Sequence, residues 1–531
     1  MKRMIKVSLI ASMAIATLQA SALSDKLGML EEELADLKKQ LKKQNKKLNK
    51  VKAHDANDNI KWSADLRTAI DNINYDLADG STRGKNDLMS MRLWLNMEYA
   101  PDENNVFKGQ LSMNKAFGAD FSSPINRNFS LGGQFDWTGN EALTNNTLKV
   151  RQAYWLYLGD SLFGTNIPWT FSVGRRPSTN GFLVNLRDDD GASSPLGHII
   201  NVEFDGLSSK LDLSNITGIP GMSFKLCMGQ GSTNAQPLFE TPTPYANGDA
   251  SGIEDIKLAG FIFEPYNDGQ YIVKTTWYRA FDLPGQDGVP AMDTANPANP
   301  SLTGISVSAF QQYGDMQGAA LSVLVDGLTE EGYFSDAKLF GSFAWSKTEP
   351  NPGSSMLGSS ESETGTSYWI GTQLPITESR KLGLEYNHGS QYWRPFTYAE
   401  DTMIGSKLAA RGDAVEAYFT YQITEALSAQ IRYTKIDYEY TGSSGFFGNF
   451  SGAANKIDDM KKGANAFKAM GGTVDANGAH NIGVVTGNLM AQGMPLAQAQ
   501  KTAGEMAGAA LFLPNVVESA QDLRFYIRYR F

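Results

Sequence analysis

Apolar and polar side chains alternate strictly in the last nine positions of the chain, 523–531, which read L-R-F-Y-I-R-Y-R-F. Apolar side chains stand at Leu523, Phe525, Ile527, Tyr529 and Phe531. A period of two places successive side chains on opposite faces of a strand. One apolar face and one polar face over about ten residues is typical of a strand between lipid and a lumen. The pattern therefore predicts a strand with Arg524, Tyr526, Arg528 and Arg530 on its lumen side; the closing strand of a soluble β domain is the alternative.

The same alternation recurs upstream and predicts sixteen strands. They cover residues 61–73, 88–99, 105–116, 147–158, 168–176, 198–213, 221–230, 253–264, 270–281, 316–327, 333–347, 365–375, 380–390, 413–423, 426–439 and 520–531. Charged or amide side chains occupy one face of the first three, which favours a wet lumen over a packed core. The segment 198–213 is interpreted as one strand with a bulge at Asp205-Gly206, since splitting it would disturb the order of the connections.

The connections alternate in length. Those after even-numbered strands are mostly short and turn-like, whereas those after odd-numbered strands are longer, as in barrels with short periplasmic turns and long outer loops. The predicted fold class is therefore all-β: a transmembrane antiparallel β-barrel of about 16 strands (14 to 18) over residues 54–531, with an N-terminal helical segment. The last outer loop, 440–519, is rich in Gly, Ala, Met and Asn, and is interpreted either as a plug or as a surface excursion.

The N-terminal part follows other patterns. Residues 1–22 combine three early bases, an apolar stretch and Ala20-Ser21-Ala22, which predicts a secretory signal peptide. Residues 23–53 carry a heptad stripe, which predicts a periplasmic coiled-coil stalk that self-associates, although the stripe does not fix the number of chains. A single helix on the barrel rim is the alternative. The apolar positions are Leu23, Leu27, Leu30, Leu34, Leu37, Leu41, Leu48 and Val51.

Composition narrows the function classes. Mean hydropathy is −0.32, and after residue 22 the chain has no apolar run as long as the roughly 18 to 20 residues of a membrane helix. A single cysteine, Cys227, excludes an intramolecular disulfide framework. Residues 54–531 hold 35 bases and 52 acids, a net charge of −17, which favours cations near the loops and lumen. Nothing indicates a nucleic-acid partner or a cofactor.

Three stretches and the leucine stalk carry a resemblance to a known family. The stretches are G-R-R-P-S-T-N-G at Gly174–Gly181, L-G-L-E-Y-N-H-G-S-Q-Y-W at Leu382–Trp393 and I-D-Y-E-Y-T-G-S at Ile436–Ser443. The chain resembles a family of Gram-negative outer-membrane porins that carries only a domain-of-unknown-function label. Its stalk and barrel are also similar to sugar porins and some trimeric anion-selective porins. This resemblance implies a homotrimer through residues 23–51 as the expected assembly. The lumenal arginines and lysines of the anion porins are not evident here, and the resemblance implies a channel without supplying a substrate.

The terminal segment also resembles the signal by which barrel proteins are recognised for assembly. The residues that match are Leu523, Phe525, Ile527, Tyr529 and Phe531. This resemblance implies the outer membrane of a Gram-negative bacterium as the location, the stalk in the periplasm, and the barrel-assembly machinery and outer-membrane lipid as partners.

The third outer loop, 177–197, is the candidate pore constriction. In sixteen-stranded porins this loop folds inward and sets acids against a basic wall, and rings of charge select ions by sign. By that analogy the constriction residues are Arg175, Arg176, Arg187, Asp188, Asp189 and Asp190. A solvated charge run on an outer loop is the alternative. The three aspartates could attract Ca²⁺, but the full set of spaced ligands is absent, so no metal site is assigned.

An enzyme is not expected. The chain has four histidines, His54, His198, His388 and His480, and none has the spacing of a zinc site or a nucleophile elbow. A hydrolase at the rim would require His198 or His388 to pair in space with Ser or Asp. The expected function is passive diffusion of small hydrophilic solutes or ions through a porin that prefers cations. The alternative is a plugged structural barrel whose stalk binds periplasmic partners or the cell wall.

Overall fold

The structure is a computed structural model, and it describes residues 60–120, 142–176, 178–237, 245–247, 254–293, 300–329, 331–397, 402–475 and 478–531. The predicted signal peptide and stalk lie outside these residues. The chain divides into two compact units, one of residues 1–61 and 99–106 and one of residues 62–98 and 107–531. In the first unit the structure describes a turn, in which the Asp102 carboxylate accepts hydrogen bonds from the backbone N–H groups of Asn104 and Asn105, both at 2.8 Å. The second unit holds the sheet that carries the candidate site.

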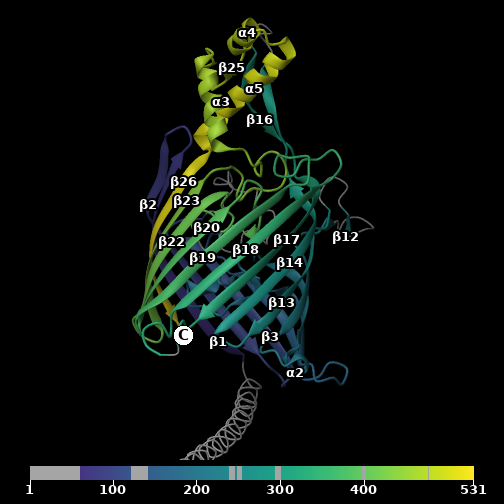
Figure 1. Cartoon of the computed structure of the whole chain (residues 1–531), viewed down its shortest axis with the longest axis vertical. Coiled ribbons are helices and arrows are strands. Elements are labelled where there is room, and N and C mark those ends of the chain that lie inside the picture. The colour runs from purple at the N-terminus through teal and green to yellow at the C-terminus, as the bar shows by residue number, and fades with distance from the viewer. Residues whose placement is uncertain are drawn as a thin grey trace, which may run out of the picture. The chain divides into compact units, whose positions relative to one another are not determined.

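Sixteen strands form one closed antiparallel barrel, which confirms the predicted fold class. They run obliquely side by side in Figure 1. In barrel order they are β1 (Lys61–Leu77), β2 (Thr82–Tyr99), β3 (Asn105–Ala116), β4 (Lys149–Gly159), β5 (Trp169–Arg176), β9 (Phe204–Asp212), β10 (Ser223–Gln230), β13 (Lys257–Asn267), β14 (Tyr271–Gly285), β17 (Gln311–Asp326), β18 (Lys338–Pro350), β19 (Thr364–Thr377), β20 (Arg380–Gly389), β22 (Gly412–Gln422), β23 (Leu427–Tyr438) and β26 (Val517–Arg530).

The first and last of these strands close the barrel. β1 pairs with β26 in an antiparallel register that sets Ile70 opposite Phe525 and Leu66 opposite Tyr529. Backbone hydrogen bonds of 2.7 and 3.0 Å between Ala64 and Phe531 extend this pairing to the end of the chain. Closure satisfies the backbone donors and acceptors that an open sheet edge would leave unpaired.

The two faces of β26 have opposite character, as the alternation predicted. Leu523, Phe525, Ile527 and Tyr529 are each 42–45% exposed on the outside, whereas Arg524, Tyr526 and Arg528 are at most 2% exposed on the inside. Outward apolar side chains recur around the wall, among them Phe343, Ile370, Leu384 and Ile431, each 45–53% exposed. The barrel therefore has an apolar outer band and a polar inner face at these strands.

The prediction for 198–213 was wrong at its N-terminal end. The strand β9 begins at Phe204, and its register against β10 runs through Asp205 and Gly206 without a bulge. Residues 198–203 instead belong to the loop that enters the barrel, where His198 and Glu203 are fully buried. The alternating pattern alone does not distinguish the end of a strand from a loop that enters the barrel, because successive side chains of such a loop can also point in opposite directions.

Two inward segments fill part of the interior, so a packed core replaces the predicted wet lumen there. In the third outer loop β6 (Gly181–Phe182) pairs in parallel with β7 (Ser193–Leu196), and β8 (Ile200–Asn201) pairs in parallel with β21 (Phe396–Thr397) from another loop. Loop and wall side chains form a buried apolar core, called the lumen core below. It includes Leu183, Leu196, Trp393, Phe396, Leu408, Tyr278, Met316, Phe340 and Trp369.

Residues 439–516, between β23 and β26, contain three helices at one end of the barrel (Figure 1). Leu302 packs with Phe467, Val485, Leu489, Ala499, Ala503 and Ala507 in a cluster separate from the lumen core. Among the described residues, no helix has the length and apolar character needed to cross a membrane. The helices are α3 (Ile457–Ala469), α4 (Gly483–Ala491) and α5 (Leu496–Phe512), with the short η5 (Leu513–Asn515).

The remaining elements are short. They are η4 (Val184–Leu186), α2 (Ser214–Thr217), β11 (Ala235–Pro237), β12 (Tyr245–Asn247), β15 (Gly288–Asp293), β16 (Ser301–Val307), β24 (Thr473–Val474) and β25 (His480–Asn481). β15, β16, β25 and β24 form a small sheet of their own, which gives α5 a surface to pack on.

The lumen core should carry much of the stability of the inward loops. Trp393 is fully buried and donates a hydrogen bond from Nε1 to the Leu408 carbonyl at 2.7 Å. We expect Trp393→Ala to lower the free energy of unfolding by about 3–5 kcal/mol, as for other buried aromatic truncations. The control Phe163→Ala, at a turn position that is 96% exposed, should change it by less than about 0.5 kcal/mol. Guanidinium unfolding in detergent micelles measures both, and equal effects would contradict a packed interior.

Candidate functional site

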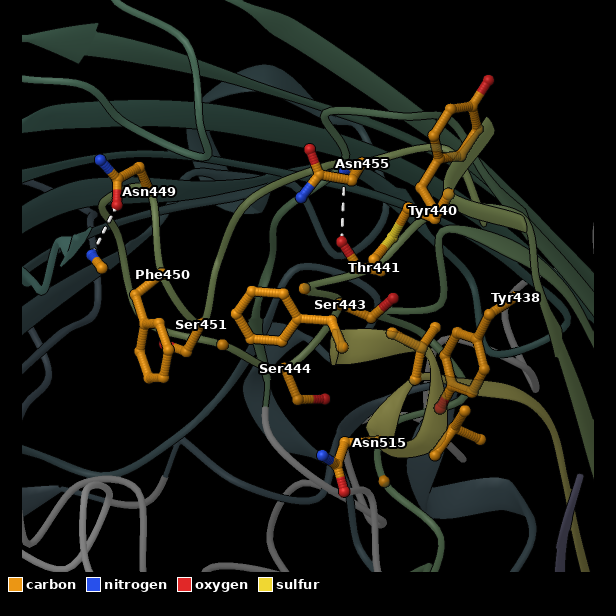
Figure 2. Close-up of a pocket in the computed structure, with 18 of the residues that line it drawn as sticks. Tyr438, Tyr440, Thr441, Ser443, Ser444, Asn449, Phe450, Ser451, Asn455 and Asn515 are labelled. Carbon is orange, nitrogen blue, oxygen red and sulfur yellow. Dashed lines mark hydrogen bonds between the residues drawn. The ribbon is translucent and has the colours of Figure 1, made fainter. Parts of the chain in front are cut away.

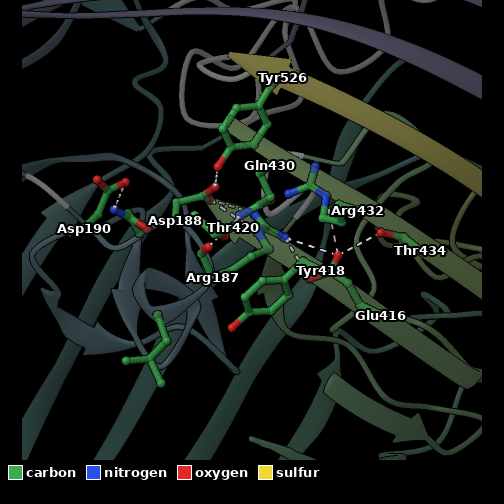
Figure 3. A network of polar contacts seen from close by, with 12 residues as sticks. Arg187, Asp188, Asp190, Glu416, Tyr418, Thr420, Gln430, Arg432, Thr434 and Tyr526 are labelled. Atoms are coloured by element: carbon green, nitrogen blue, oxygen red, sulfur yellow. Dashed lines mark hydrogen bonds and ion pairs between the residues drawn. The ribbon is translucent and has the colours of Figure 1, made fainter. Parts of the chain in front are cut away.

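The tip of the third outer loop is bound to the inner face of β26. Tyr526 donates a hydrogen bond from its hydroxyl to Asp188 Oδ1 at 2.8 Å, as Figure 3 shows. Arg528 donates to the Asp188 carbonyl at 2.9 Å and to Asp190 Oδ1 at 2.8 Å. Arg530 donates to the same Asp188 carbonyl at 2.7 Å and lies 3.1 Å from Asp190 Oδ1. The alternating arginines of the last strand thus hold the acidic loop tip.

A second set of charges holds the same loop at β22 and β23, the two strands that precede β26 in the barrel order. Arg187 Nη1 lies 3.3 Å from Glu416 Oε1, and the Glu416 carboxylate is fully buried on β22. Glu416 also accepts a hydrogen bond from Lys407 Nζ at 2.5 Å and one from Thr434 Oγ1 at 2.8 Å, and Arg432 Nε lies 3.9 Å away. Figure 3 shows Arg187, Arg432 and Thr434 converging on this carboxylate. A buried carboxylate is stable in a fold only with such partners.

Lys407 connects this network to another inward loop. Its ammonium group lies 2.6 Å from Glu385 Oε2 on β20 and 2.5 Å from Glu416 Oε1. Trp369 Nε1 donates to the same Glu385 oxygen at 3.0 Å. The third loop and the loop that carries Lys407 are therefore attached to the wall through one shared carboxylate, that of Glu416.

Backbone contacts and local conformation complete the loop tip. Gln373 Nε2 donates to the Leu186 carbonyl and Gln430 Nε2 donates to the Arg187 carbonyl, both at 2.9 Å. Leu183 and Asp189 have positive φ angles of 78° and 51°, which are costly for non-glycine residues. Such conformations persist where surrounding contacts hold the backbone in place. Here the hydrogen bonds from the Gln373 and Gln430 side chains hold it.

The six predicted constriction residues divide into two groups. Arg187 and Asp188–Asp190 come together at the loop tip, and Lys381 Nζ lies 2.7 Å from Asp189 Oδ1. Arg175 lies near the start of the loop, 3.1 Å from Asp205 and 3.9 Å from Glu203. Arg176 lies over the ring of Tyr154, 4.3 Å from its centroid.

Several charged groups of the site were not predicted. Arg151 on β4 lies 2.9 Å from the buried Glu203 and donates to Gln110 at 2.7 Å and Thr179 at 2.5 Å. Arg524 donates to Asp71 on β1 at 2.5 Å, both side chains being fully buried. Arg151, Asp71 and Glu416 stand at inward positions of predicted strands, so alternation could have found them. Lys407 has no such signal because it lies in a loop.

A cavity of about 540 Å³ lies between the loop tip and the wall of β1 to β4 and β26. Its charged lining consists of Asp65, Asp189, Asp190, Arg151, Arg528 and Arg530, three acids and three bases. Trp94 also lines it, with Arg92 and Arg151 over its ring at 3.4 and 4.3 Å from the centroid, favourable cation–π geometry. Ser63 and Phe531 extend the lining to the end of the barrel where the chain terminates. The cavity is a polar space, lined by charge, within the barrel.

Both strand-associated histidines have the partners that a hydrolase at the rim would require. His198 lies 2.8 Å from Ser342 Oγ and 2.9 Å from Ser367 Oγ, and His388 Nδ1 lies 2.9 Å from Asp413 Oδ1. His198 is fully buried in the lumen core, and burial lowers its pKa to about 3. A neutral imidazole enclosed in this way has no access to a substrate. In the described part of the chain, no group of three or more His, Cys, Asp or Glu residues could hold a metal ion.

The fold and the site define a class of protein: a closed sixteen-stranded β-barrel whose third outer loop is bound inside by ion pairs. The chain belongs to the DUF3373 family, described as proteins of unknown function, whose model matches residues 82–482. This confirms the family resemblance. No curated protein sequence matches the chain.

Solved barrels align with most of the chain at low identity. The anion-selective porin from Comamonas acidovorans has a TM-score of 0.43 at 8% identity, covering 89% of this chain and 99% of its own. In-vitro folded OmpT, an outer membrane protein of Vibrio cholerae, has a TM-score of 0.40 at 10% identity, with 89% and 97% covered. OmpF of Salmonella typhi in complex with daunomycin has a TM-score of 0.39 at 10% identity, with 89% and 97% covered.

The Glu416 network should control the order of the loop tip. Removing the carboxylate by Glu416→Ala takes one counter-charge from each of Arg187, Lys407 and Arg432, and breaking a buried ion pair typically costs about 3–5 kcal/mol. We expect the backbone amides of 186–190 to exchange hydrogen faster in folded Glu416→Ala than in the native chain, as measured by hydrogen–deuterium exchange. Glu425→Ala, at an exposed turn position, is the matched control. Exchange in Glu416→Ala as slow as in the control would show that other contacts hold the loop.

Proposed function

We propose that the protein is a porin of the Gram-negative outer membrane through which small hydrophilic solutes or ions diffuse passively. The observation that carries the proposal is the charged cavity of about 540 Å³ inside a closed barrel with an apolar outer band. The outward apolar side chains fit contact with lipid, and a closed barrel is one of the two structures that can span a bilayer. The assembly-signal residues Leu523, Phe525, Ile527, Tyr529 and Phe531 support the same location.

The proposal assigns the path of the solute to the cavity, along one side of the interior. The lumen core occupies the side of Tyr278, Phe340 and Trp369, whereas the cavity lies beside β1 to β4 and β26. The loop-tip aspartates and the arginines of β26 face each other across this side. The proposal therefore assigns selection of solutes to the contact between the third loop and the last strand.

A modest cation preference belongs to the proposal. Its support is the net charge of −17 over residues 54–531, which raises the cation concentration near the protein. The cavity itself has equal numbers of acids and bases in its charged lining. Its ion pairs also neutralise each other locally, so the preference should be weak and should fall as salt screens the charges.

Planar bilayers containing the full chain test conduction and selectivity together. We expect stepwise conductance and a reversal potential of cation-selective sign across a KCl gradient. The variant Asp189→Asn with Asp190→Asn removes two of the three cavity acids and should shift the reversal potential in the anion direction. Asp160→Asn, in the exposed β4–β5 connection, is the control and should leave it unchanged. Conductance steps without any such shift would remove the loop tip from the solute path.

The second candidate is a structural barrel closed by its own loops. The packed core of loop and wall side chains favours it. Gly197 N donates to the Phe182 carbonyl at 3.1 Å, so a short Gly-Ser linker can replace residues 183–196 without straining the ends. Silence of the intact chain, together with conductance after this replacement, would support the structural barrel and contradict the porin. The helices of 457–512 pack in their own cluster, so the third loop is the segment to remove.

The proposed assembly is a homotrimer formed through the stalk at residues 23–51, which lies outside the described residues. The full chain in detergent should then have three times the mass of the barrel without residues 23–51. Mass photometry of both proteins measures this, and a trimer that survives the deletion would move the interface to the barrel.

Contacts with the barrel-assembly machinery and the cell wall are part of the same proposal. No catalytic step is included, and the burial of His198 supports that assignment.

A further inference from the structure

A second cavity, of about 470 Å³, lies at the end of the barrel that carries α3 to α5. Its walls come from the segment after β23, from the start of β15 and from residues 512–517, where the chain returns to β26. Figure 2 shows the labelled side chains around this space. The cavity is apart from the charged one, since the two share no lining residue. Its volume falls in the roughly 300–1,000 Å³ range of small-molecule sites.

The lining of this cavity has a distinct chemistry, because it contains no charged side chain. Aromatic rings such as Tyr438 and Phe450 stand beside hydroxyl and amide groups such as Ser444, Asn449 and Asn455. Hydroxyl and amide groups can each donate and accept hydrogen bonds. A lining of this kind disfavours ions, which need a counter-charge when they are desolvated, and it offers too many polar groups for a purely apolar guest.

The cavity wall is held in place by groups that do not face a ligand. The fully buried Arg411 donates from its guanidinium to the Thr441 carbonyl at 2.7 Å and to the Gly452 carbonyl at 2.9 Å. Its backbone N–H donates to Ser443 Oγ at 3.1 Å. Gly445 approaches Ser451 so closely that an added Cβ would lie 2.0 Å from the Ser451 carbonyl oxygen. A wall fixed before binding lowers the entropic cost of capturing a flexible ligand.

Some polar groups of the lining remain available. The Asn449 side chain accepts a hydrogen bond from Gly288 N at 2.8 Å, and Thr441 accepts one from Asn455 N at 3.2 Å (Figure 2). The Ser444 hydroxyl and the Asn455 amide make no side-chain hydrogen bond to another described residue, and both side chains are exposed. The cavity therefore has accessible donors and acceptors beside its rings.

We propose that this cavity binds a neutral saccharide at the outer end of the barrel. A sugar ring has an apolar C–H face that packs on aromatic side chains and a rim of hydroxyls that pair with serine and asparagine. It carries no charge, as the lining requires. The ligand is either a free oligosaccharide or the neutral glycan chain of a membrane lipid, which share this chemistry. The inference does not depend on conduction, because binding at this cavity involves none of the groups of the charged one.

Calorimetry on the full chain in detergent tests the proposal with three probes. They are a neutral glucan hexamer, a neutral polysaccharide chain released from lipopolysaccharide, and a hexamer of galacturonate as the charged counterpart. We expect saturable binding of at least one neutral probe and binding of the galacturonate that is at least about tenfold weaker. Preference between the two neutral probes tells the free ligand from the membrane glycan. Absence of saturable binding for both neutral probes, or equal binding of the charged one, would overturn the proposal.

Variants then locate the binding. Ser444→Trp should fill the cavity and Phe450→Ala should remove a ring, and each should weaken binding by about tenfold or more, which corresponds to about 1.4 kcal/mol. Ser360→Trp, an equal change on an exposed loop outside the lining, should not weaken it. The third cavity variant is Asn455→Ala, which deletes an exposed amide. Because this change should not disturb the fold, it still tests the proposal if the other two cavity variants fail to fold. Binding that survives all three cavity variants would place the saccharide elsewhere and overturn the assignment.

Discussion

Pairing of β1 with β26 is the constraint on which the rest of the molecule depends. A sheet that ends in an open edge leaves a row of backbone donors and acceptors unpaired, and a bilayer offers no water to satisfy them. The register that sets Ile70 opposite Phe525 satisfies them with the chain itself. It also decides which side chains turn inward, because a shift by one residue would exchange the faces of a strand. The inward position of Arg524 and Arg528 follows from this closure.

Once those arginines face inward, the interior has to neutralise them. Arg524 pairs with Asp71 across the closing seam, and Arg528 pairs with Asp65 and Asp190. The acidic tip of the third loop thus serves as counter-charge for the last strand. At Glu416 on β22 the charges are reversed: the wall supplies the carboxylate, and two loops supply the cations Arg187 and Lys407. Ion pairs therefore attach the loops to the barrel wall, and the apolar side chains of the loops and the wall pack together in the lumen core.

This arrangement separates three environments in one barrel. The core around Trp393 is dry and packed, the cavity beside β26 is charged, and the cavity behind Tyr438 is neutral. Each suits a different kind of contact: packing for stability, ion pairs for a polar solute path, and rings with hydroxyls for a neutral sugar.

The sequence by itself determined the sixteen strands, their order and the faces of β26, because a period of two with short and long connections in turn leaves few other folds. It also located Arg187 and Asp188–Asp190 in one loop. Only the tertiary structure decided that residues 198–203 enter the barrel, that Arg175 and Arg176 lie apart from the loop tip, and that Lys407 joins Glu385 to Glu416. Alternation reports the face of a residue within its own strand, whereas an ion pair between a loop and a distant strand depends on the curvature of the closed wall and on the room that remains inside it.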